Sequence, residues 1–259
     1  MKKYLWITIA LLLTVWMVGC GGGGQQPAPD EGAAGEGEEA AGSVDSSTAA
    51  TISGKVLFTG TAPELDPILM DAEPVCQEKH PDGAFTETVI VNSDGTLMNV
   101  FVYVKDGLGD LAFPAPQEPV LLDQTGCQYV PHVFGMQVGQ DLIIRNSDGI
   151  LHNIHPMPTT NRPFNLGQPV EMDTTRTFDQ VEMFITIECD VHDWMLGYVS
   201  VLNHPYFDTT GNEGSFTLPN LPPGTYTIAA WHELYGEQTM EVTIGASEAM
   251  EIEFTFEGG

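Results

Sequence analysis

The stretch Cys189-Asp-Val-His192-Asp-Trp-Met195 places a thiol, an imidazole and a thioether within seven residues. Few metals use these three donors together. Copper that cycles between Cu(I) and Cu(II) does, in trigonal sites of one cysteine and two histidines with a long, weak axial methionine. The stretch therefore predicts a type 1 copper site to which Cys189, His192 and Met195 contribute. A second histidine has to come from elsewhere in the chain.

The best source of that second imidazole is the upstream stretch 146–155, with the sequence NSDGILHNIH. It follows an apolar, strand-like run, and its first histidine, His152, completes the ligand set. His155 is the alternative to His152, and is otherwise an exposed side chain or a group beside the ligands. The predicted copper ligands are His152, Cys189, His192 and Met195.

Nearly all structural signals outside this motif are those of β-strands. Short runs rich in β-branched or alternating apolar residues recur, and Gly, Pro, Asn and Asp separate them. Strands at this spacing suggest β-sandwiches. The expected strands are 51–58, 86–91, 99–105, 119–122, 133–138, 141–145, 183–188, 198–202, 215–218, 225–231, 238–244 and 250–256.

The middle of the chain, residues 118–203, resembles the cupredoxins, the blue copper proteins that include amicyanin and plastocyanin. Tyr129-Val-Pro131 and the following strand, turn at Gly139 and strand ending in Asn146 resemble the opening hairpin of that family. Its first ligand falls where His152 stands here. The resemblance implies a Greek-key β-sandwich that holds one copper ion.

The ligand loop resembles that of amicyanin in its spacing. Residues 183–188 resemble the strand that delivers the thiolate of Cys189. Val191 and Asp193 depart from the family, because the amicyanin loop carries prolines. The resemblance therefore transfers the ligand set, whereas the rigidity of the loop and its reduction potential do not follow from it.

The resemblance also implies roles for neighbouring residues. Asn153 is expected to tie the two ligand loops together and to donate its backbone N–H toward the sulfur. Electrons are expected to enter and leave near His192. Trp194 either belongs to an apolar docking patch around that ligand or packs in the core.

The flanking segments resemble a second module. Gly211–Tyr226 resembles the second half of a carboxypeptidase regulatory-like, transthyretin-type β-sandwich, and 51–60 with 99–104 resembles its first half. We expect the segments 52–117 and 204–259 to pack together, with the cupredoxin domain inserted between them. The alternative is that 52–117 adds strands to the cupredoxin. The expected fold class is all-β, a Greek-key cupredoxin sandwich plus a second small β-sandwich.

The N-terminus reads as an export signal. Lys2 and Lys3 precede an apolar run that ends in Met17-Val-Gly-Cys20. That ending resembles a bacterial lipobox, so residues 1–20 are expected to be a lipoprotein signal peptide and Cys20 the lipidated residue. The alternatives are an uncleaved anchor and an ordinary secretory signal. Residues 21–51, rich in Gly, Ala and Glu, are expected to form a disordered tether.

The charge of the chain is strongly acidic. It holds 36 Asp and Glu against 8 Lys and Arg, a formal net charge of −28. Nucleic acid is thereby excluded as a natural partner, because phosphate binding needs the opposite sign. An acidic surface suits basic redox proteins such as basic c-type cytochromes. The alternative reading is adaptation to a salty habitat or simple solubility.

The remaining cysteines, Cys76 and Cys127, form an even pair. An oxidising compartment favours a disulfide between them. The alternative is a second metal site, because His80 follows Cys76 and His132 follows Cys127 within five residues.

These observations predict an extracytoplasmic, membrane-tethered type 1 copper protein that carries single electrons between redox partners and is not an enzyme. It would lie in the periplasm, at the outer membrane or at the cell surface. The alternatives are a copper carrier or scavenger, and a surface scaffold or adhesion module with structural copper. A copper carrier would exchange its metal readily, so copper affinity and exchange rate distinguish it from an electron carrier. Failure of the bound copper to cycle reversibly would indicate the scaffold.

Overall fold

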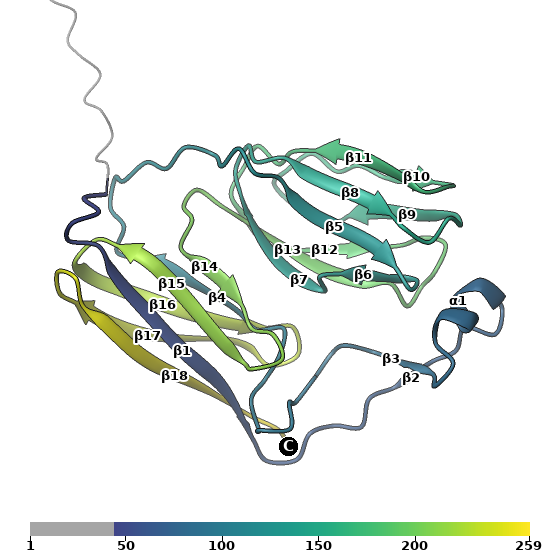
Figure 1. Ribbon diagram of the computed structural model, residues 1–259, viewed down its shortest axis with the longest axis horizontal. Helices are drawn as coiled ribbons and strands as arrows, with labels where there is room; N and C mark the ends of the chain where they lie inside the picture. The colour runs from purple at the N-terminus through teal and green to yellow at the C-terminus, as the bar shows by residue number, and fades with distance from the viewer. Residues whose placement is uncertain (1–43) are drawn as a thin grey trace, which may run out of the picture. The chain divides into compact units, whose positions relative to one another are not determined.

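The computed structural model describes residues 44–259 (Figure 1). The expected signal peptide, the expected lipidation site Cys20 and residues 21–43 of the expected tether lie outside this range. The tether was expected to extend to residue 51, but the first strand already begins at Ala50, whose side chain is buried opposite Leu221. Among the described residues, no helix combines the length and the apolar character that crossing a membrane requires.

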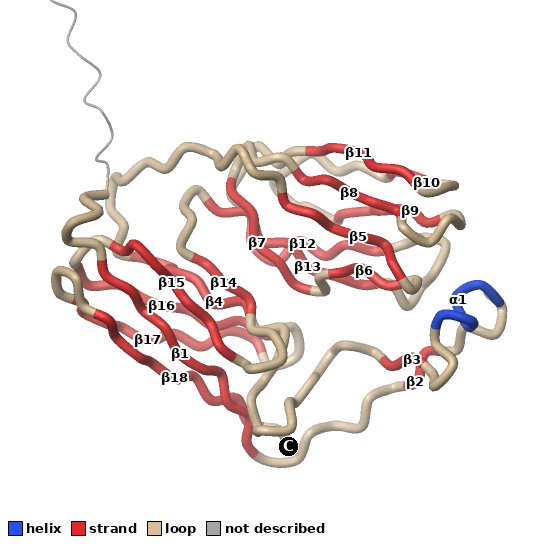
Figure 2. Tube along the Cα trace, viewed as in Figure 1, coloured by secondary structure: helices blue, strands red, loops and turns tan. Residues whose placement is uncertain are grey.

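The described chain is built of strands and one short helix, which confirms the all-β fold class (Figure 2). The helix is α1 (Pro74–Lys79). The strands are β1 (Ala50–Thr59), β2 (Pro67–Ile68), β3 (Ala84–Phe85), β4 (Phe101–Asp106), β5 (Val120–Thr125), β6 (Gln128–Val130), β7 (Val133–Gln137), β8 (Leu142–Asn146), β9 (His152–Pro156), β10 (Leu166–Gln168), β11 (Met172–Arg176), β12 (Glu182–Glu188), β13 (Leu196–Leu202), β14 (Phe207–Thr209), β15 (Ser215–Leu221), β16 (Gly224–His232), β17 (Gly236–Ile244) and β18 (Ala249–Glu257).

The strands from β5 to β13 form one β-sandwich, which we call the middle sandwich. Its two sheets have the strand orders β10-β9-β12-β13-β7 and β11-β8-β5-β6. Both sheets contribute to one apolar core. Side chains alternate across a strand, so β8 turns Leu142, Ile144 and Asn146 inward. This alternation carries a polar residue, Asn146, into the core at the end of β8, just before the loop that leads to His152.

The strands before and after the middle sandwich share two other sheets, which we call the outer sandwich. Their orders are β15-β1-β18 and β14-β4-β16-β17. β1 pairs with β15 in the antiparallel and with β18 in the parallel direction, and β4 lies between β14 and β16. A separate apolar core fills this sandwich. Strands that are far apart in the sequence, such as β1 and β18, are therefore neighbours in one sheet.

The outer sandwich and its junction with β13 contain two buried histidines. His204 follows β13, and His232 ends β16. Each ring accepts, through Nδ1, the backbone N–H of the residue two positions later, Tyr206 or Leu234, at 3.2 Å. An acceptor nitrogen carries no proton, so these bonds require the neutral ring. Burial lowers the pKa of both His204 and His232 to about 4.

This arrangement predicts acid sensitivity. A histidine in the unfolded chain binds its proton near pH 6.5, whereas the folded chain resists protonation of His204 and His232 down to about pH 4. The unfolded state binds more protons between these values, so stability falls as the pH drops through the window. Protonation of the two histidines together lowers the free energy of unfolding by up to roughly 7 kcal/mol. Replacing both by asparagine keeps an acceptor for each N–H.

We expect the thermal unfolding midpoint, measured by circular dichroism, to fall more steeply between pH 6.5 and 4 in the wild type than in the double variant. Parallel pH profiles would contradict this account of His204 and His232.

Candidate metal centre

Three predicted ligands meet at one end of the middle sandwich. His152 begins β9, Cys189 directly follows β12, and His192 lies on the loop to β13. Nδ1 of His152 lies 2.9 Å from Nδ1 of His192, and Sγ of Cys189 lies 3.8 Å from the same His192 nitrogen. The three ligand atoms lie within 4.8 Å of one another, and all three residues are buried. Two imidazole nitrogens and one sulfur thus converge on a common point.

The backbone folds the ligand loop into a tight turn. The N–H of Met195 donates to the carbonyl of His192 at 3.0 Å, and the N–H of Cys189 donates to the carbonyl of Met195 at 3.3 Å. β12 and β13 are antiparallel, with Glu188 opposite Leu196, so both ends of the loop are anchored in one sheet. Met195 is buried in the same apolar cluster as Cys189. The loop therefore brings the thiol and the imidazole together, and its methionine is buried in the same core cluster as the cysteine.

The thiol of Cys189 is set up to ionise. Burial raises its pKa, but hydrogen bonds from His152 and His192 and from the N–H groups of Asn153 and Val191 outweigh burial and lower the pKa to about 6. The N–H of Asn153 lies 3.5 Å from the sulfur. A metal-binding cysteine has to be deprotonated, and this thiol is so at neutral pH.

Asn153 also connects the two ligand segments. Its side-chain oxygen accepts the N–H of Asp190 at 2.6 Å, and its side-chain amide donates to Asn165 at 2.7 Å. β9, which begins with one ligand, is thereby joined to the residue that follows Cys189. This contact holds the imidazole and the thiol in register.

Asp148 was not singled out from the sequence, yet it orients His152. One carboxylate oxygen lies 2.9 Å from Nε2 of His152, which leaves Nδ1 of that ring to face His192. The carboxylate also accepts the N–H groups of Gly126 and Cys127 at 2.8 and 2.7 Å. Such a partner fixes the tautomer and orientation of a metal-binding histidine. The sequence offered one signal for this role of Asp148, namely that an acidic residue stands four residues before a histidine in a segment typical of a turn.

The buried carboxylate is held in its charged form. Burial raises the pKa of Asp148, but the hydrogen bonds from His152, from the amide of Cys127 and from Lys79 prevail and place the pKa far below its usual range. Nζ of Lys79 lies 3.0 Å from the carboxylate. Lys79 ends α1, so the short helix takes part in the support of the metal centre.

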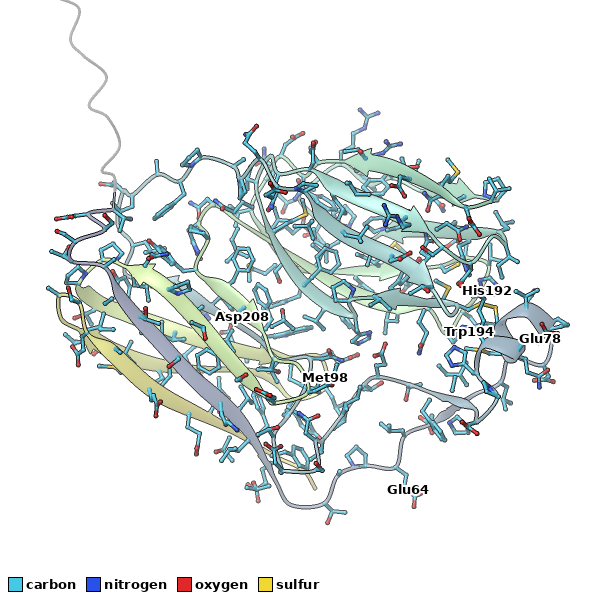
Figure 3. All side chains as sticks on the ribbon, in the orientation of Figure 1. Glu64, Glu78, Met98, His192, Trp194 and Asp208 are labelled. Atoms are coloured by element: carbon cyan, nitrogen blue, oxygen red, sulfur yellow. A yellow bond between two sulfur atoms is a disulfide. The ribbon has the colours of Figure 1, made fainter. Side chains whose placement is uncertain are left out.

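The outer edge of His192 is covered. Cys76 and Cys127 form a disulfide, and Sγ of Cys76 lies 3.9 Å from Nε2 of His192. The indole N–H of Trp194 donates to the carbonyl of Cys127 at 3.0 Å, and the indole ring lies 5.0 Å from the imidazole. Figure 3 shows His192 and Trp194 at the end of the middle sandwich that faces α1, which carries Glu78.

His192 is consequently only 1% exposed. Electrons were expected to enter and leave near His192, but the structure exposes no edge of this ring. The disulfide and Trp194 lie over the imidazole. Trp194 is partly buried beside the disulfide, which agrees with packing rather than with an open docking patch.

The other candidate ligands have different partners. Nδ1 of the half-buried His155 lies 3.0 Å from the carboxylate of Asp190, outside the ligand group. His80 bonds the carbonyl of Gly126 at 2.6 Å. The two sulfur atoms of Cys76 and Cys127, which a second metal site would have used, are bonded to each other.

The residues at this centre fit copper. Two imidazole nitrogens and one thiolate form the trigonal donor set of type 1 copper, and a buried methionine lies in the same apolar cluster as the cysteine. A structural zinc site would require four firm ligands, whereas the described residues bring together only three nitrogen or sulfur donors of that kind here.

No protein-family model matches the chain, and the search of curated proteins finds no match. Several solved structures resemble part of it. A copper-containing nitrite reductase from Thermus scotoductus SA-01 shares 19% sequence identity at a TM-score of 0.31, over 38% of this chain and 24% of that protein. An oxidized amicyanin mutant shares 21% identity at a TM-score of 0.29, over 32% of this chain and 81% of amicyanin. A purple cupredoxin from Nitrosopumilus maritimus shares 19% identity at a TM-score of 0.28, over 32% of this chain and 98% of that protein.

Proposed function

We propose that the chain is a type 1 copper protein that carries single electrons between redox partners. One observation carries the proposal: the facing Nδ1 atoms of His152 and His192, 2.9 Å apart, with the thiol of Cys189 within 4.8 Å of both. Met195 is proposed as the weak axial ligand because it is buried in the same cluster as Cys189. Bound copper supplies a reversible one-electron couple at this point.

The protein's own residues prepare the centre for such a role. Asp148 and Asn153 hold the ligand segments from outside, through bonds of 2.9 Å to His152 and 2.6 Å to the amide of Asp190. Ligands that are fixed before the metal binds need to move little when its charge changes. The burial of His152, Cys189 and His192 excludes water from the ligand atoms. Both features support an electron carrier, and the covered ligands support a carrier rather than an enzyme that admits a substrate to the metal.

We also propose where the protein acts and which kind of redox partner it meets. The apolar run before Cys20 and the cysteine itself support an extracytoplasmic protein anchored by lipid. The net charge of −28 supports a basic redox partner, such as a basic c-type cytochrome, whose association would weaken with added salt.

Titration of the purified chain with Cu(II), followed by visible absorption and EPR, tests the proposal. We expect one equivalent of copper to produce an intense thiolate-to-copper band and the EPR spectrum of a type 1 site. A pale, weakly absorbing complex would refute the type 1 assignment. Reversible voltammetry of the loaded protein then separates an electron carrier from a scaffold with structural copper.

A further inference from the structure

A small segment of the chain lies over the metal centre. Residues 66–86, which we call the lid segment, comprise β2, α1 and β3 and project from the outer sandwich toward the ligand end of the middle sandwich (Figure 1). The two ends of the lid segment meet, because the N–H of Thr86 donates to the carbonyl of Asp66 at 3.0 Å. The lid segment therefore forms a closed loop whose two ends lie together at its base.

The lid segment is weakly built. β2 and β3 are two residues long, and α1 has six residues. A helix this short is not stable on its own in water. Within residues 44–259, the backbone hydrogen bonds of the lid segment connect it only to itself. Leu69 and Phe85 are 76% and 50% exposed, so much of its apolar surface faces solvent rather than the centre.

Few contacts fasten the lid segment to the middle sandwich. A small cluster packs Met70, Cys76 and Ala84 of the segment against Cys127, and the partly buried Ile150 and Trp194 of the middle sandwich pack against this cluster. Two polar contacts add to it, from Lys79 to Asp148 at 3.0 Å and from His80 to the carbonyl of Gly126 at 2.6 Å, beside the disulfide. The disulfide is the one covalent connection, and it joins residues 51 apart in sequence.

We propose that residues 66–86 form a lid that the Cys76–Cys127 disulfide latches over the metal centre, so that copper enters and leaves only when the lid opens. The inference rests on the proposed copper function. It follows from the position of Cys76, whose sulfur contacts the outer nitrogen of His192 at 3.9 Å while His192 is 1% exposed. Regions held by few buried contacts open locally at low free-energy cost, and the latch suppresses that opening.

The double variant Cys76→Ser, Cys127→Ser tests the latch in two independent ways. In the copper-loaded protein, transfer of copper to an excess chelator should be about tenfold faster or more than in the wild type, while the visible band keeps its intensity. In the metal-free protein, alkylation of Cys189 by iodoacetamide, read on its peptide by mass spectrometry, should accelerate by a similar factor. Cys189 is 3% exposed and serves as a probe that needs no metal.

The two readouts distinguish failure of the lid from failure of the copper assignment. Equal alkylation rates in the wild type and the double variant would overturn the lid whether or not copper binds. Accelerated alkylation in a protein that forms no blue complex would keep the lid and reject the proposed function.

A milder variant covers the case in which the double variant does not fold. His80→Ala keeps the disulfide and removes only the bond to Gly126, and it should accelerate alkylation of Cys189 by a smaller factor. Hydrogen exchange of the wild type, with and without a dithiol reductant, gives a third measurement. Faster exchange on reduction confined to residues 66–86 supports the latch, and exchange that rises equally in β12 and β13 overturns it.

Discussion

Replacing Cys189 by serine is expected to abolish the intense visible band of the copper-loaded protein completely. The band arises from charge transfer between a thiolate and Cu(II), and Cys189 is the one free cysteine among the described residues. A serine hydroxyl does not ionise at neutral pH and cannot replace the sulfur. His152 and His192 remain, so Cu(II) should still bind more weakly and give a pale complex. Visible absorption and EPR during a Cu(II) titration measure both effects.

A control on the same loop separates loss of the ligand from disturbance of the loop. Val191 is 42% exposed, and its aliphatic side chain offers no ligand atom. Val191→Ala should therefore keep the band at full intensity. Should the Cys189→Ser protein retain the band, its sulfur ligand would have to be another residue and the proposed centre would be wrong.

The features that sequence reasoning predicted are those encoded by local pattern. Alternation of apolar residues defines strands such as β8, where Leu142 and Ile144 point inward. The all-β class follows from many such runs and is confirmed. Two of the converging ligands are also a local matter, because Cys189 and His192 lie on one turn, whereas His152 begins a strand that is distant in the sequence. In an antiparallel sheet, β9 and β12 pair directly, and this pairing brings the two ligand segments together.

The features that escaped prediction depend on contacts between distant segments. Cys76 and His192 are 116 residues apart, and no periodicity in residues 66–86 signals that they lie over a ligand. In the sequence, Asp148 has the pattern of a turn residue, because Asn146, Ser147 and Gly149 surround it. Its role appears only when the Gly126–Cys127 turn and Lys79 approach it. Short motifs thus determine which residues are ligands, whereas the tertiary fold determines how exposed each ligand is.

The second large effect is expected at Asp148. Asp148→Asn removes the charge that Nε2 of His152 contacts at 2.9 Å and that Lys79 contacts at 3.0 Å. Loss of the partner that orients a metal-binding histidine typically lowers metal affinity by about 10- to 100-fold. We expect a decrease in that range for copper, measured by competition with a chelator of known affinity. The type 1 spectrum should persist, because all four proposed ligands remain.

Asp173→Asn is the matched control for this change. Asp173 also forms an ion pair, with Arg145 at 2.8 Å, but its side chain is 48% exposed and it lies on β11, outside the ligand group. Both variants remove one negative charge from a protein of net charge −28, so any general effect of charge on copper affinity is shared. Affinity should fall only in Asp148→Asn. An equal decrease in both variants would show that the Asp148 carboxylate acts through the overall field of the protein, because orientation of His152 requires its direct contact with the ring.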